Sequence, residues 1–82
     1  MKNSIVFPQF RKYPNEKAYF KIISEKEWEE IQIMGNRFTH HKFIAKIFPD
    51  HNYLHDMTHD FEKYWLRIDE NEYERIKKEL HF

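Results

Sequence analysis

Apolar and polar side chains alternate in two stretches near the N-terminus, residues 10–13 and 17–23. Such alternation is typical of strands that bury one face and expose the other. Residues 14–16, Pro-Asn-Glu, favour a tight turn, because Pro presets φ for the first central position and Asn tolerates the second. We therefore expect a β-hairpin here, with residues 1–8 as a loose lead-in.

A nine-residue pattern occurs twice, as Ile-Ser-Glu-Lys-Glu-Trp-Glu-Glu-Ile at 23–31 and Ile-Asp-Glu-Asn-Glu-Tyr-Glu-Arg-Ile at 68–76. In each copy a capping residue, Ser24 or Asp69, precedes a Glu by three positions, which is the capping box of a helix N-terminus. Both copies are thus predicted to end a strand and begin a helix. Local convergence on capping explains the repeat most simply, with an ancient duplication or a ligand-binding role as alternatives.

The first copy leaves one alternative open. Trp28, Ile31 and Met34 recur at three-residue spacing, and a helix that stops at Gly35 accommodates them. In the alternative, the helix ends near Glu30 and residues 31–34 form a short strand that turns at Gly35 and the following Asn.

The remaining pattern predicts further elements in alternation. Residues 38–48 form the longest predicted strand, which we expect to be central in the sheet because its second half is apolar on both faces. A helix capped by Asp50 or Asn52 follows to about residue 62, then a strand at 64–68, then a helix opened by Asp69. The order β-β-α-β-α-β-α predicts a single two-layer α+β domain over residues 1–82, with a roughly four-stranded, mainly antiparallel sheet and two to three short helices on one face.

Composition narrows the class of protein without fixing a function. The 82 residues have no net charge, but residues 1–46 carry nine Lys/Arg against five Glu, and residues 47–82 carry five against nine Asp/Glu. No Cys is present, and no apolar run approaches the roughly 18 residues of a membrane span. The chain has no phosphate-binding glycine motif and no nucleophile motif, so we expect no cofactor, no enzymatic activity and a cytoplasmic location.

Three histidines form the sharpest candidate for metal chemistry. His51, His55 and His59 recur at four-residue spacing, so a helix aligns them on one ridge. Two His at this spacing can share a metal ion, but three along one straight helix cannot easily surround it. A solvent-exposed polar face that uses His is the simpler interpretation of the ridge.

A second candidate site combines basic and aromatic residues that an open sheet face can present to a protein partner or to nucleic acid. Its predicted members are Arg11, Lys12, Tyr13, Tyr19, Lys21, His41 and Lys42. Basic and acidic residues balance and no RNA-binding signature is present, which favours a protein partner. We therefore expect a small non-catalytic interaction or adaptor module that binds a protein or a second copy of itself. Nucleic-acid contact is the alternative, and a metal response through the histidine ridge is the third.

Overall fold

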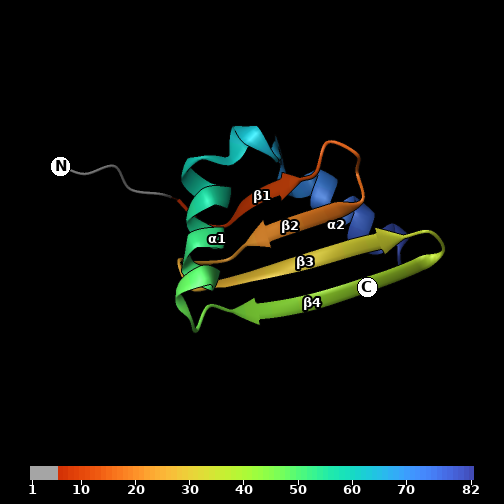
Figure 1. The fold of residues 1–82 in the computed structure, drawn as a ribbon. Helices are drawn as coiled ribbons and strands as arrows, with labels where there is room; N and C mark the ends of the chain where they lie inside the picture. The colour runs from red at the N-terminus through yellow and green to blue at the C-terminus, as the bar shows by residue number, and fades with distance from the viewer. Residues whose placement is uncertain (1–5) are drawn as a thin grey trace.

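The computed structural model describes residues 6–82 as an antiparallel sheet of five strands between two helices (Figure 1). In chain order these elements are β1 (Gln9–Lys12), β2 (Ala18–Ile22), β3 (Glu27–Met34), β4 (Arg37–Ile44), α1 (Phe48–His59), the 3₁₀ helix η1 (Phe61–Lys63), β5 (Leu66–Ile68) and α2 (Glu70–Glu79). Across the sheet the strand order is β4-β3-β2-β1-β5. The predicted α+β class and the antiparallel sheet are confirmed, with one more strand in the described residues than the sequence predicts.

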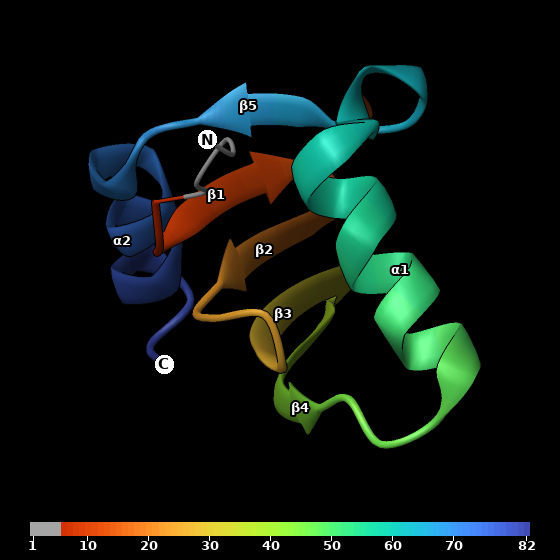
Figure 2. The ribbon, with the colours of Figure 1, turned by 90° about the vertical axis from the view of Figure 1, so that its left-hand side faces the viewer.

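The two helices cover opposite faces of the sheet, so the domain has three layers (Figure 2). The face under α1 buries Ala18, Phe20, Ile22, Trp28 and Ala45 against Leu54, Met57 and Trp65. The face under α2 buries Phe10, Tyr19, Ile31 and Ile68 against Tyr73. This differs from the predicted placement of all helices on one face. The physical reason is that neighbouring strand residues such as Tyr19 and Phe20 are both bulky and apolar, so neither face can be left in water.

The predicted hairpin of β1 and β2 is confirmed. The backbone N–H of Glu16 donates to the carbonyl of Tyr13 at 2.9 Å, and Lys17 N donates to Asn15 Oδ1 at 2.9 Å. Glu16 adopts a φ of 61°, the left-handed conformation that closes the turn. Of the predicted lead-in, residues 1–5 lie outside the described residues.

The first copy of the repeat is a strand, which corrects the predicted helix over residues 24–34. Glu27–Met34 is β3, and it pairs with β2 on one side and β4 on the other. Ser24 Oγ accepts from Lys26 N at 3.1 Å, so it caps a tight turn between β2 and β3. The alternative turn at Gly35 is confirmed, since Gly35 has the positive φ of 64° that a two-residue hairpin loop requires at its first position.

The second copy behaves as predicted. Asp69 Oδ1 accepts from Glu72 N at 2.9 Å and caps α2, whose Tyr73, Ile76 and Leu80 pack on the sheet. The two copies therefore share a sequence pattern but adopt different secondary structures. Local convergence explains this better than a duplicated structural unit.

The strand predicted over residues 38–48 is β4, and it lies at an edge of the sheet, which corrects its expected central position. Its apolar second half is exposed: Phe43 retains 36% and Ile44 56% of the accessible surface. Helix α1 begins at Phe48 after Ile47 as its N-cap, which corrects the predicted cap at Asp50 or Asn52. Asp50 lies in the first turn instead, because its carboxylate reaches back to the backbone before the helix, where Oδ2 accepts from Lys46 N at 3.1 Å. Leu54 and Met57 of α1 are buried as its periodicity predicts.

Candidate functional site

The predicted basic and aromatic surface is not assembled as one exposed face. Arg11 and Tyr19 retain only 2% and 4% of their accessible surface. Arg11 faces α1, whereas Tyr19 packs beneath α2. Tyr13, Lys12 and Lys21 are half-buried, and Lys42 with His41 is exposed on β4. The expected open sheet face is absent from the described part of the chain because a helix covers each side.

Arg11 has a structural environment. Its Nε donates to the carbonyl of Met57 at 2.9 Å, its Nη1 donates to that of Phe10 at 2.8 Å, and its guanidinium stacks 4.0 Å from the ring centre of Phe61. Burial, and then the nearby charge of Arg67, lowers the pKa of Arg11 to about 10. These contacts join β1 to the C-terminal half of α1, so the guanidinium is committed to the fold.

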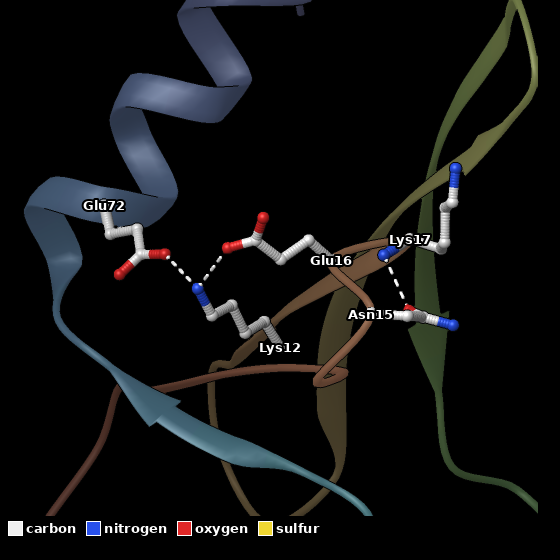
Figure 3. A network of polar contacts seen from close by, with 5 residues as sticks. All are labelled: Lys12, Asn15, Glu16, Lys17 and Glu72. Carbon is white, nitrogen blue, oxygen red and sulfur yellow. Dashed lines mark hydrogen bonds and ion pairs between the residues drawn. The ribbon is translucent and has the colours of Figure 1, made fainter.

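Lys12 lies in an ion-pair network that Figure 3 shows. Its Nζ is 2.7 Å from Glu16 Oε2 and 2.8 Å from Glu72 Oε2, and these two hydrogen bonds raise the pKa of Lys12. Glu16 belongs to the β1–β2 turn and Glu72 to the first turn of α2 (Figure 3). Lys12 therefore ties the start of α2 to the hairpin. Its ammonium group is already paired with the carboxylates of Glu16 and Glu72.

A buried carboxylate, Glu29 of β3, organises the face under α2. Tyr73 Oη donates to Glu29 Oε1 at 3.1 Å, and His40 Nε2 lies 3.2 Å from the same oxygen. Lys77 Nζ and Lys42 Nζ follow at 3.7 and 3.8 Å. Burial alone would raise the pKa of Glu29, but the His40 contact, the Lys77 charge and the Tyr73 hydroxyl outweigh it and lower the pKa. We term this the Glu29 cluster, and it links β3, β4 and α2.

The histidine ridge lies on α1 as predicted. His51, His55 and His59 are all exposed, and the rings of His55 and His59 stack with centroids 4.6 Å apart. Within residues 6–82, no three His, Asp or Glu side chains converge on a point where they could hold a metal ion. A metal response at the ridge would therefore need ligands from outside these residues.

Exposed apolar side chains lie along and around β4, and all of them except Met34 belong to the segment predicted as a central strand. They are Met34, Phe38, Phe43, Ile44, Ile47 and Phe48, with exposed fractions from 36% to 77%. Phe38 and Ile44 lie on the face under α2 and Phe43 lies on the face under α1, so these side chains border the strand on both of its faces. Exposed apolar side chains beside an edge strand are a feature of interaction surfaces. We call this surface the β4 edge.

A separate groove opens beside the β1–β2 turn, and its lining is dominated by aromatic rings. Tyr13, Pro14 and Asn15 of the turn face Tyr53 and Asp56 of α1 and Tyr64 and Trp65, which precede β5; the volume is about 600 Å³. Such a volume falls within the range of about 300–1,000 Å³ typical of ligand pockets. We call it the aromatic groove. Among these residues, Tyr13 was the one predicted as a site residue. The groove forms only when three segments that are distant in sequence come together, and the sequence pattern of each segment by itself indicates a turn or core packing.

Comparison with known proteins leaves the site without a precedent, since no family model, no curated protein and no solved structure matches the chain. No helix within residues 6–82 is long and apolar enough to cross a membrane. The β4 edge and the aromatic groove are therefore the two surfaces whose geometry bears on function.

Proposed function

We propose that this chain is a small non-catalytic protein-interaction module, and that its partner at the β4 edge is a second copy of itself. The observation that carries the proposal is the outer edge of β4, an eight-residue strand with one free side bordered by exposed apolar residues. An exposed, long and apolar edge is a template for another strand. The other edge strand, β5, has only three residues, so it offers far fewer backbone groups.

The free side of β4 presents a defined set of backbone groups. The β3–β4 hairpin closes at the pair Met34 and Arg37, and Ala45 N donates at 2.7 Å to the carbonyl of Lys26, the residue before β3. Odd-numbered residues of β4 thus direct their N–H and C=O groups towards β3. The groups of Phe38, His40, Lys42 and Ile44 point away from it and can pair with another strand.

These groups are self-complementary in an antiparallel pair with a two-fold axis at His41. In this register Phe38 lies opposite Ile44 of the second copy, and His40 lies opposite Lys42. All outward N–H and C=O groups of the four residues then find partners, and two apolar pairs form on the face under α2. Aromatic and β-branched cross-strand pairs contribute about 0.2–1 kcal/mol each beyond the backbone ladder.

Electrostatics opposes this pairing only weakly. The two Lys42 side chains lie diagonally across the axis, and at about 8 Å in water their repulsion is about 0.5 kcal/mol. The charge of Lys42 is also offset by Glu29 at 3.8 Å.

The experiment is sedimentation velocity over micromolar to about millimolar protein, with one disruptive and one matched control variant. Phe38→Lys places a charge on the β4 edge, and Leu66→Lys makes the same change on β5 at almost equal exposure, 44% against 45%. The wild-type chain and Leu66→Lys should dimerise, while Phe38→Lys should stay monomeric. A wild-type monomer throughout this range, or equal disruption by both variants, would contradict self-association.

The two alternatives receive less support. Nucleic-acid contact assumed aromatic residues on an open sheet face, but Tyr19 is buried beneath α2. A metal response assumed a ligand set that the ridge alone does not complete within residues 6–82. The β4 edge requires neither assumption.

A further inference from the structure

We infer that the aromatic groove binds a proline-rich segment of another protein, in the polyproline II conformation and carrying a Lys or Arg. This surface is separate from the β4 edge, because the described residues that line the groove include none from β4 and none of the exposed apolar residues beside it. The inference therefore adds a second contact to the proposed module and stands independently of self-association.

The rings of the groove are arranged around Trp65. Tyr53 and Tyr64 meet its indole nearly edge-on, with interplanar angles of 73° and 90° and centroids 5.7 and 5.9 Å away. Tyr13 stacks on Trp65 at 27° and 6.2 Å. Trp65 and its neighbours thus form a fixed floor, while Tyr64 retains 63% of its accessible surface as an exposed wall. Pro14 at the turn adds a further rigid apolar surface.

A proline-rich segment suits this lining because of its shape and because it loses little conformational entropy on binding. Aromatic-lined grooves receive polyproline II segments because pyrrolidine rings pack flat on aromatic faces and the ligand is already extended before it binds. The carbonyl groups of such a segment have no internal partner, so they accept hydrogen bonds from donors of the groove. Tyr hydroxyls and the amide of Asn15 are donors of this kind.

Trp65 provides an independent indication that an acceptor is missing. Its indole Nε1–H is buried and has no hydrogen-bond partner among the described residues. Buried N–H groups are nearly always paired in native structures, so an unpaired one in the lining of a groove points to a ligand. Because Trp65 lines the groove, its indole N–H signal is a reporter of binding.

Charge selects among extended ligands. Among the lining residues within 6–82, Asp56 alone is charged, and it is exposed. A carboxylate beside aromatic faces favours a cationic side chain through ion pairing and cation–π contact. The same carboxylate repels phosphate, so bases of nucleic acid are disfavoured as the occupants of these rings.

The test is a titration of the isotopically labelled chain with a polyproline peptide ending in arginine, followed by amide and indole NMR signals. We expect saturable binding, with the largest shifts at the groove and at the Trp65 indole. Tyr64→Ala should weaken binding by about three- to ten-fold through loss of an aromatic contact. Asp56→Asn should weaken it by about two- to five-fold, the range for an exposed ion pair.

Matched probes decide the chemistry. The Phe38→Lys variant, altered only at the β4 edge, should bind the peptide as the wild type does, which separates this inference from self-association. A glycine-serine peptide with the same arginine should bind much more weakly. Absence of saturation, equal binding of the glycine-serine peptide, an unaffected Tyr64→Ala variant, or tighter binding of oligothymidylate would each overturn the inference.

Discussion

Replacement of Glu29 by Gln should destabilise the domain strongly near neutral pH and weakly in acid. The substitution keeps the shape of the side chain and its acceptor for the Tyr73 hydroxyl, but removes the negative charge. The charge faces Lys77 and Lys42 at 3.7 and 3.8 Å, together with His40 at 3.2 Å. The variant thus isolates what the buried charge contributes to the contact between α2 and the sheet.

The magnitude follows from these distances. At about 3.7 Å one ion pair is worth about 1 kcal/mol in water and about 4.5 kcal/mol at an effective dielectric constant of about 20. The Lys42 side chain is 72% exposed and its contribution is screened, whereas Lys77 is 24% exposed and less so. Desolvation of the carboxylate offsets part of the gain, so we expect a loss of about 1.5–3 kcal/mol in the free energy of unfolding.

The pH dependence gives the decisive readout. The folded-state pKa of Glu29 is lowered below its ordinary value of 4.5. Its stabilisation is therefore complete above that value and is lost as pH falls through the folded-state pKa. The difference between wild type and Glu29→Gln should shrink on going from about pH 7 to about pH 3.

The assay is urea unfolding monitored by Trp fluorescence at both pH values. The control is Glu27→Gln, the same change on the same strand at an exposed position, which should stay within about 0.5 kcal/mol of wild type. Equal loss at both pH values would refute the electrostatic reasoning, because a shape effect does not titrate. A loss no larger than that of the control would show that the cluster contributes nothing to stability.

Three further predictions concern the fold. Asp69→Ala should lower the free energy of unfolding by about 0.5–2 kcal/mol, because it removes a helix cap. Ser24→Ala should lower it clearly less, because Ser24 caps only a turn. Equal losses in chemical denaturation would contradict the assignment of β3 as a strand. Trp28→Ala should lower the free energy of unfolding by about 3–5 kcal/mol in the same assay, whereas Phe48→Ala, at a residue with 77% exposure, should change it little. A small loss at Trp28 would argue against its burial beneath α1. Arg11→Lys should lower stability by about 1–3 kcal/mol because Lys cannot reproduce the fork of donors, and an unchanged melting curve would refute that role.

The sequence predicts the elements whose local and tertiary preferences agree. The β1–β2 hairpin and α2 have the turn residues, apolar stripe and cap that their final structures require, whereas α1 has the predicted apolar stripe but not the predicted cap. The error at residues 24–34 arose where these preferences conflict. Four Glu residues and a capping box favour a helix locally, but strands on both sides supply hydrogen bonds that the isolated segment cannot reveal.

Buried charge explains why the pattern of β3 misleads. Glu29 and Glu30 occupy alternate faces of a covered sheet, and both are nearly inaccessible. Glu29 is matched by its cluster, while Glu30 accepts from Trp28 Nε1 at 3.0 Å and from Gln32 Nε2 at 2.8 Å. A hydropathy pattern treats Glu as a mark of exposure, so it cannot identify a strand whose polar residues are satisfied inside the protein.

The candidate sites also divide into features that the local sequence determines and features that depend on tertiary contacts. The histidine ridge needs only the geometry of one helix and was correctly placed on α1. The aromatic groove requires the contact of the β1–β2 turn with α1 and with the segment before β5, and no local pattern encodes that contact. The exposure of the β4 edge likewise depends on strand order, since an apolar edge strand and an apolar central strand share one sequence pattern.

The strand order also divides the domain into two parts, one held by contacts between neighbouring segments and one held by contacts between segments far apart in sequence. Strands β1 to β4 form successive hairpins between neighbours in sequence, whereas β5 returns across the sheet to pair beside β1, with Phe10 opposite Ile68. The two residues of that pair are 58 positions apart in sequence, and contacts over such long separations form late and slowly. We therefore expect the four-stranded meander to form first and β5 with α2 to dock last. Native-state hydrogen exchange should accordingly find β5 opening at lower free energy than β2 and β3.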